Sequence, residues 1–167
     1  MADKAGSKSV AEELLMIWLS GNGEDQEFDQ DSFIAKKFRR SKIMKGAIKQ
    51  AIEQYKQTGN TKVIGGEITF DSSEPDLWLG VRKANYNLLI SEEEKTWDLL
   101  LFRVTVARYV VVVTVYDYYN FNKGDEVGDG LGSDLNNIGY GLHEMGLGKD
   151  YSWTASYTYE TKWKVFG

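Results

Sequence analysis

The chain has 167 residues, of which 25 are acidic and 20 basic, so its formal net charge is −5. At this length one globular domain can bury a sizeable core without covalent cross-links. The sequence has no cysteine and one histidine, His143, which excludes disulfides, a thiolate nucleophile and a zinc site built on two histidines.

Helices are expected in the first third of the chain. Ser9 is a typical N-cap for a helix that ends at Ser20. A second helical region runs from Asp31 to Thr58, and Ser41 is a point at which it can divide. Its basic side chains are expected to form a solvated helix face, and nucleic acid is the less favoured partner because the chain is acidic overall. This basic run consists of Lys36, Lys37, Arg39, Arg40, Lys42, Lys45 and Lys49.

From Thr61 onward, β-branched and aromatic residues set a period of two, which is typical of strands. Connections are expected at DSSEP (71–75) and SEEEK (91–95). The run RYVVVVTVY (108–116) is apolar on both faces, which favours a central strand covered on two sides. The expected strands are Lys62–Phe70, Leu77–Ile90, Trp97–Ala107, Tyr109–Tyr116 and Tyr151–Glu160, with the third and fourth forming one bent strand in the alternative interpretation.

A late helix is expected over residues 134–145. Gly139 and Gly141 lie inside it, and two glycines there favour close packing against another backbone or the edge of a pocket. The apolar stripe of this helix is expected to be Leu135, Ile138, Leu142 and Met145.

These elements predict one α+β domain over residues 1–167. A helical lead-in (1–60) is followed by a mostly antiparallel, strongly twisted sheet (61–167), which the late helix crosses. No apolar stretch approaches the roughly 20 residues of a membrane-spanning helix. The apolar run from Leu14 to Leu19 is too short for a secretion signal and follows two glutamates.

The end of the central strand carries the main candidates for chemistry. There a hydrophobic strand delivers Asp117, Tyr119 and Asn120 to the edge of the sheet, and active sites are often built in this way. Continued alternation puts Asp117 on the side of Val115, where partial burial would raise its pKa or let it hold a cation. The structural alternative is that Asp117 caps the strand end and Asn120 makes a turn.

A glycine-rich acidic loop follows the strand. Its carboxylates Asp125, Asp129 and Asp134, with Asp117, are candidate oxygen ligands for a divalent cation such as Mg²⁺ or Ca²⁺. The alternative is a solvated loop, because the spacing is not that of a known calcium loop. His143 lies at the flank of the late helix, where it faces either water or the strand end, and facing Asp117 it would be a general acid or base.

The segment DYYNFN (117–122) resembles the D-x-Y-D-F-N signature of the colicin M family of bacteriocins, in which the motif also follows a hydrophobic strand. Proteins of that family cleave lipid II, a lipid-linked peptidoglycan precursor, with the help of a divalent cation. The resemblance implies that Asp117 is the catalytic acid and that Tyr119 neighbours it. Asn120 stands where the family has a second aspartate, and the family's His-Arg pair is absent from positions 126–127. Either His143 supplies the missing imidazole or the site is altered.

Two functions follow as expectations. The first is an antibacterial toxin or effector domain, a cation-assisted hydrolase of a phosphodiester or pyrophosphate bond, secreted or delivered to a competitor's cell envelope without a signal peptide of its own. The order of elements also resembles the C-terminal toxin domains of bacterial polymorphic toxins. Its partners would be a lipid-linked cell-wall precursor or an immunity protein. The second is a non-catalytic binding, immunity or adaptor protein of the same competition systems, which would act in the cytoplasm.

Overall fold

The computed structural model describes residues 9–59, 63–121 and 131–165. In these residues the chain is α+β, with five helices and six strands in one sheet that is mixed rather than purely antiparallel. The chain divides into two compact units. The single-domain expectation stays a prediction. Unit 1 comprises the chain up to Glu27, Phe70–Arg82 and Tyr116–Thr154, and unit 2 comprises Phe28–Thr69, Lys83–Val115 and the chain from Ala155.

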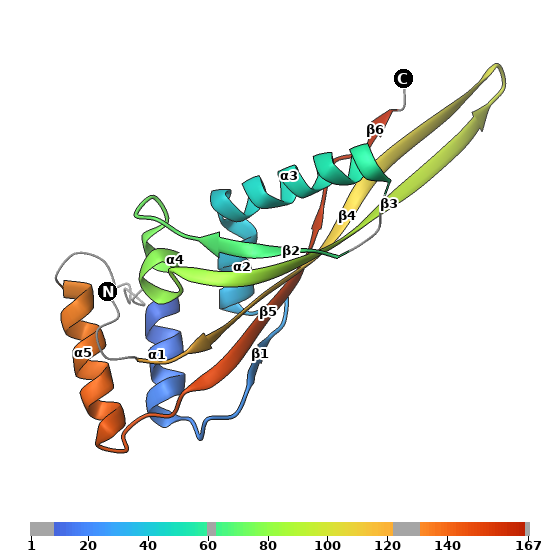
Figure 1. Cartoon of the computed structure of the whole chain (residues 1–167). Helices are drawn as coiled ribbons and strands as arrows, with labels where there is room; N and C mark the ends of the chain where they lie inside the picture. The colour runs from blue at the N-terminus through green and yellow to red at the C-terminus, as the bar shows by residue number, and fades with distance from the viewer. Residues whose placement is uncertain (1–8, 60–62, 122–130, 166–167) are drawn as a thin grey trace, which may run out of the picture. The chain divides into compact units, whose positions relative to one another are not determined.

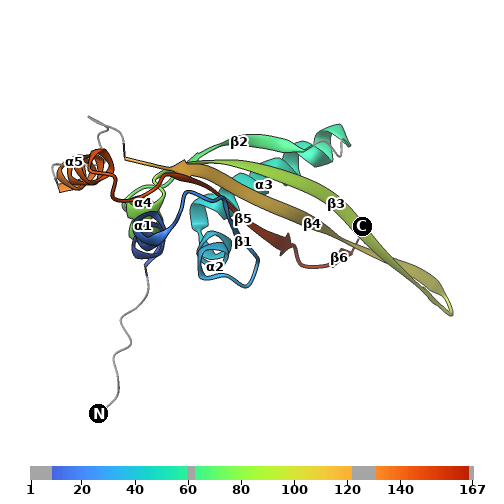
Figure 2. The ribbon, with the colours of Figure 1, turned by 90° about the horizontal axis from the view of Figure 1, so that it is seen from below.

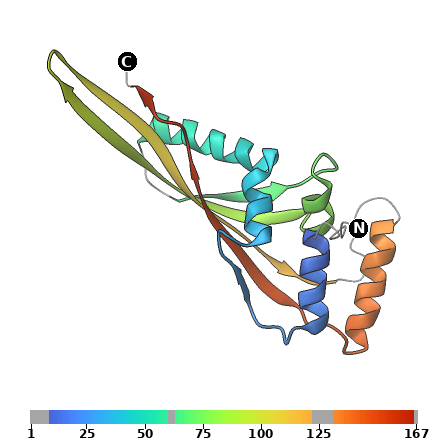
Figure 3. The same cartoon turned by 180° about the vertical axis from the view of Figure 1, so that it is seen from behind.

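Unit 1 contains the helices α1 (Val10–Ser20), α4 (Pro75–Gly80) and α5 (Leu131–Glu144). Ser9 and Glu12 form a capping box at the start of α1, as the N-cap prediction requires. The Asp76 carboxylate of α4 accepts a further hydrogen bond of 2.7 Å from the Val10 amide, which joins the starts of α1 and α4 (Figure 3). The buried side of α1 carries Val10, Leu14 and Trp18, each 0% exposed.

In unit 2, Ser41 divides the predicted helical region into α2 (Phe33–Arg40) and α3 (Lys42–Thr58). The Ser41 amide donates to the end of α2, and its hydroxyl accepts a hydrogen bond from the Met44 amide at the start of α3. α3 ends at Gly59, whose φ of 62° is the left-handed conformation that favours glycine. α3 packs along the strands β2 (Ile64–Thr69) and β3 (Lys83–Leu99) (Figure 2).

The order of strands in the sheet is β1, β5, β4, β3, β2, and β6 pairs with β4 (Figure 1). β2 and β3 are antiparallel, with Ile64 opposite Leu88 and Thr69 opposite Lys83. β5 confirms the predicted alternation, because Tyr151, Trp153, Ala155 and Tyr157 are all buried. The strands are β1 (Gln26–Phe28), β2 (Ile64–Thr69), β3 (Lys83–Leu99), β4 (Phe102–Tyr119), β5 (Tyr151–Glu160) and β6 (Lys164–Val165).

The predicted strand Leu77–Ile90 is wrong in its first half. Pro75 opens the short helix α4, because its fixed φ and missing amide hydrogen suit the first turn of a helix. The chain then turns at Arg82, whose φ is 58°, and β3 begins at Lys83. The predicted connection 91–95 is also wrong, since β3 runs through it to Leu99. The expected strands 97–107 and 109–116 are one strand, β4, as the alternative interpretation had it.

Two burial predictions also need correction. Val111, Val113 and Val115 are fully buried, but Val112 between them is 42% exposed, so β4 is covered on one face rather than two. On α5, Ile138 and Met145 are exposed, whereas Asn136 and Gly139 are buried. At Ile138, and at Met145 directly after the helix, the predicted apolar stripe is therefore not the packed side, and the side chain of Leu135 lies outside the described residues. Among the described helices, none is long and apolar enough to cross a bilayer.

Candidate functional site

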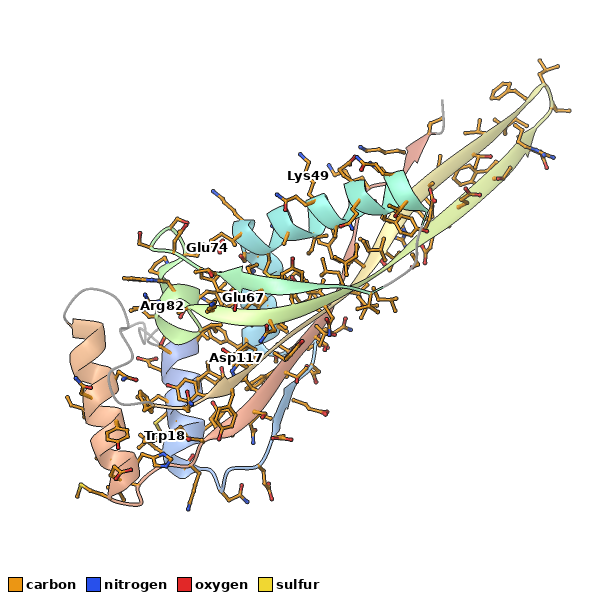
Figure 4. All side chains as sticks on the ribbon, viewed as in Figure 1. Trp18, Lys49, Glu67, Glu74, Arg82 and Asp117 are labelled. Atoms are coloured by element: carbon orange, nitrogen blue, oxygen red, sulfur yellow. The ribbon has the colours of Figure 1, made fainter. Side chains whose placement is uncertain are left out.

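The motif residues lie where β4 ends, inside unit 1. Asp117 is half-buried on β4, on the side of buried Val115, as the alternation predicted (Figure 4). Tyr119 is the last residue of the strand, and Asn120 follows it half-buried. Burial raises the pKa of Tyr119 to about 12, so its phenol keeps its proton at neutral pH and is a hydrogen-bond donor there.

Aromatic rings hold this strand end in place. The Tyr119 ring stacks on Tyr151 of β5 at 5.5 Å between centroids and meets Phe121 edge-on at 5.6 Å. Phe121 in turn meets Trp18 of α1 edge-on at 4.8 Å. The Tyr151 hydroxyl donates a hydrogen bond of 2.8 Å to the Leu14 carbonyl, and burial raises the pKa of Tyr151. The end of β4 is therefore anchored to α1 through a continuous aromatic cluster.

His143 and Asp150 form the titratable pair of this unit. The His143 Nδ1 lies 3.2 Å from the Asp150 Oδ1, and the Trp18 Nε1 donates a hydrogen bond of 2.9 Å to the same oxygen. An ionised carboxylate only accepts hydrogen bonds, so Nδ1 carries a hydrogen, and in the neutral imidazole the lone pair is then on Nε2. The His143 side chain is 38% exposed and that of Asp150 is 21% exposed. The Nε2 atom thus belongs to an oriented imidazole that water can reach.

Two glycines let the rings approach this pair. The Phe121 ring packs on Gly139 of α5 where a Cβ would stand, so the close neighbour at that position is an aromatic side chain and not the backbone that the sequence suggested. Gly148 has a φ of +82°, and a Cβ there would lie 2.5 Å from the Trp18 ring. Nothing lies within 4 Å of a Cβ built on Gly141. The turn from α5 into β5 therefore depends on glycine at 148, both for its backbone conformation and for the space that Trp18 fills.

Sequence reasoning identified His143 but missed its partner Asp150. The two residues are seven apart and meet because the chain reverses between them, with positive φ at Gly146 and Gly148. These two glycines were the only signal in the sequence that could have suggested the pairing. The pairing of His143 with Asp117 stays a prediction.

The cation site is tested by its donor set. Asp125 and Asp129 lie outside the described residues. Among the residues that the structure does describe, no three histidine, aspartate or glutamate side chains gather in a group that could hold a metal ion. The described residues therefore do not by themselves fit a cation. A cation held by Asp117 with Asp125 and Asp129 stays a prediction.

Unit 2 has a pocket of about 440 Å³ that shares no residue with the motif. Its lining includes Ile52 and Val165 and also an ion pair of 2.7 Å between Lys56 and Glu53. This pair raises the pKa of Lys56 and lowers that of Glu53. The lining contains more cationic than acidic side chains, so its electrostatics favour anions. Its lysines are Lys45, Lys49, Lys56, Lys162 and Lys164.

Comparison of the chain with models of protein families, with curated proteins and with solved structures found no match.

Proposed function

We propose that the chain is a hydrolase whose general base is His143, oriented by Asp150. The observation that carries this proposal is the bond from the imidazole Nδ1 to the Asp150 carboxylate, itself held by the Trp18 Nε1. A carboxylate behind a histidine fixes the tautomer with a basic Nε2 and stabilises the imidazolium that forms when this atom takes a proton. Asp150 is a positioning residue in this scheme, because it acts through His143.

The proposed reaction is attack of water on a phosphodiester or pyrophosphate bond. The His143 Nε2 takes a proton from the attacking water while the water oxygen bonds to phosphorus. The bond from phosphorus to the leaving oxygen breaks. The Tyr119 phenol, protonated at neutral pH, donates a hydrogen bond to a phosphate oxygen as negative charge develops on it. The imidazolium then returns the proton to the leaving oxygen. Asp117 is proposed as a further residue of this site, on the resemblance of residues 117–122 to the colicin M signature.

The proposed substrate is a lipid-linked precursor of the bacterial cell wall, and the proposed biological role is that of an antibacterial effector domain. This part of the proposal is supported by the resemblance of residues 117–122 to the colicin M signature. The resemblance also suggests two partners, the precursor itself and an immunity protein that blocks the domain. Delivery would be to the envelope of a competing cell.

The first test is toxicity in a bacterial host, with the chain expressed either with or without a periplasmic export signal. We expect lysis only on export, its loss in Asp117→Ala and His143→Ala, and its increase in Asn120→Asp. Glu144→Ala is the matched control, because Glu144 is the exposed neighbour of His143 on α5. Toxicity of His143→Ala equal to that of the unchanged chain would refute the assignment of the base.

A second test separates chemistry from folding. The purified chain is incubated with lipid-linked precursor, and release of the water-soluble headgroup is measured. For His143→Ala we expect added imidazole to restore part of the lost rate, since free imidazole replaces a missing base but repairs no unfolded chain. Asp150→Asn keeps the shape of the pair but loses the carboxylate that fixes the tautomer of His143, so its rate is expected to fall by up to about 10⁴-fold.

The second candidate function is a non-catalytic immunity or adaptor protein. It is favoured by Asn120, because an amide at the position of the family's second aspartate can neither take a proton nor carry a charge. This candidate predicts that neither the unchanged chain nor Asn120→Asp is toxic or releases headgroup. Binding to a toxin of the same competition system would then be its activity.

A further inference from the structure

The hairpin of β3 and β4 continues far beyond the rest of its sheet. β2 pairs with β3 only as far as Leu88, and β6 pairs with β4 at Val106 and Ala107. Between these points and the turn, the two strands have only each other as described partners (Figures 1 and 3). The Thr96 and Thr105 hydroxyls meet across the pair at 3.0 Å. We call residues 91–105 the ribbon, and residues 91–103 are all exposed.

The end of the ribbon is apolar. Leu100 and Leu101 form its turn and are 105% and 94% exposed. Tight hairpin turns in water usually carry glycine, asparagine or aspartate at these positions, so two leucines are a poor choice for a turn that only meets water. Trp97, Leu99 and Phe102 stand directly behind them and are 50–61% exposed. We call these five residues the tip.

The charged residues of the ribbon fall into two groups, one beside the tip residues and one farther from the turn. Asp98 and Arg103, the charges nearest the turn, bind each other across the strands at 2.6 Å and so enter any apolar phase as a neutral pair. Farther back, Glu92, Glu93 and Glu94 form an acidic zone, in which Glu93 is paired with Arg108. Glu94 and Leu99 are five positions apart on the strand, a distance of roughly 15–20 Å. Lys95 follows the three glutamates and lies 4.6 Å from the centre of the Trp163 ring, so residues 92–95 together still carry a net negative charge. The apolar turn thus has a neutral ion pair beside it and the acidic zone farther along the ribbon.

We propose that the tip inserts into the surface of a lipid bilayer. The apolar side chains surround a turn that is exposed on all sides, which suits a fluid apolar phase better than the single flat face of a protein partner. Trp97 lies at the depth where its ring would meet the lipid headgroups, the position that tryptophan favours in membranes. The acidic zone would be repelled by anionic headgroups, so the surface that fits is zwitterionic. Membrane binding stands independently of the proposed hydrolase activity, and with that activity it would concentrate the chain where lipid-linked substrates lie.

The experiment uses a fluorescent label whose emission shifts to the blue in an apolar environment. Because the chain has no cysteine, Leu101→Cys gives one labelling site at the tip, and Glu94→Cys gives a matched site in the acidic zone. With vesicles of phosphatidylcholine we expect a blue shift at 101 and none at 94. No shift at 101, or equal shifts at both sites, would overturn the proposal.

A variant with a favourable turn sequence shows whether Leu100 and Leu101 cause the binding to vesicles. Leu100→Asn together with Leu101→Gly creates the asparagine-glycine turn that two-residue hairpins favour, so the ribbon is expected to stay folded. We expect its partition onto phosphatidylcholine vesicles to fall at least about tenfold, because two leucine side chains no longer leave water. Anionic phosphatidylglycerol in the vesicles should weaken binding of the unchanged chain. Undiminished binding by the variant, binding that requires anionic lipid, or a tip that only joins two copies of the chain would each refute insertion.

Discussion

Replacing Gly139 by alanine tests the packing that fixes the candidate site. A Cβ on residue 139 would collide with the Phe121 ring, which cannot withdraw freely because Trp18 and Tyr119 hold it edge-on at 4.8 and 5.6 Å. Overpacking of this kind costs about 1–3 kcal/mol. Alanine in a helix gains about 1 kcal/mol over glycine, so the net change for Gly139→Ala is a loss of about 0–2 kcal/mol.

The matched control lies two residues away on the same helix. A Cβ on Gly141 has nothing within 4 Å, so Gly141→Ala should keep the full helical gain of about 1 kcal/mol. Helical preference cancels between the two variants, and their difference of about 1–3 kcal/mol is the cost of the Phe121 collision. For a chain of this length it corresponds to a separation in melting temperature of about 2–12 °C.

Thermal unfolding followed by far-ultraviolet circular dichroism measures this separation directly. Near-ultraviolet dichroism adds a local signal, because a displaced Phe121 changes the environment of Trp18. Equal stabilisation by the two alanines would refute the reasoning. It would mean that the Phe121 ring does not pack against α5, so Phe121 would not connect the end of β4 to the helix that carries His143.

Three further predictions concern hydrogen bonds and protons. Tyr151→Phe should lower the free energy of unfolding by about 1–2 kcal/mol, because it leaves the Leu14 carbonyl without its donor. Tyr157→Phe should be neutral or stabilising, since the buried Tyr157 hydroxyl has no hydrogen-bond partner among the described residues. Urea titrations compare the two variants. Ser41→Ala should cost about 1–2 kcal/mol in the same assay, because it removes the side-chain cap of α3 at a buried position, and an unchanged midpoint would contradict this role. Burial raises the pKa of Tyr119 from 10.0 to about 12, so its contribution to stability is intact below pH 10 and is lost as the pH rises to 12. Between pH 10 and pH 12 the free energy of unfolding of Tyr119→Phe should therefore fall by about 2–3 kcal/mol less than that of the unchanged chain. Equal falls in the two proteins would contradict the raised pKa.

Much of the fold was accessible from the sequence. Strong local signals gave the N-cap at Ser9, the division at Ser41 and the alternation of β5, because each depends on neighbours in the chain. The α+β class followed from the change of period after the helices. α4 was not predicted because six residues are too few to show helical periodicity, although Pro75 marked its start.

The errors share a tertiary cause. The glutamates at 92–94 suggested a loop, but a ribbon exposed on both faces tolerates charge at every position. The double covering of β4 was predicted from its apolar character, but Val112 is 42% exposed, and β-branched residues are frequent in strands whether or not both faces are covered. At the site, the motif residues were found through their sequence pattern, whereas Asp150 depended on a chain reversal that no periodicity reports.

The run of glutamates also has a bearing on solubility. Beyond Leu88 the outer edge of β3 pairs with no strand in the described chain, so its amides and carbonyls are open to strands of other molecules, the geometry from which aggregation starts. Glu92, Glu93 and Glu94 occupy this open edge. A second copy added edge to edge would bring like charges within a few ångströms of one another, at a cost that grows with each glutamate. The three glutamates, which suggested a loop in the sequence, thus disfavour pairing of this open edge with a strand of a second molecule.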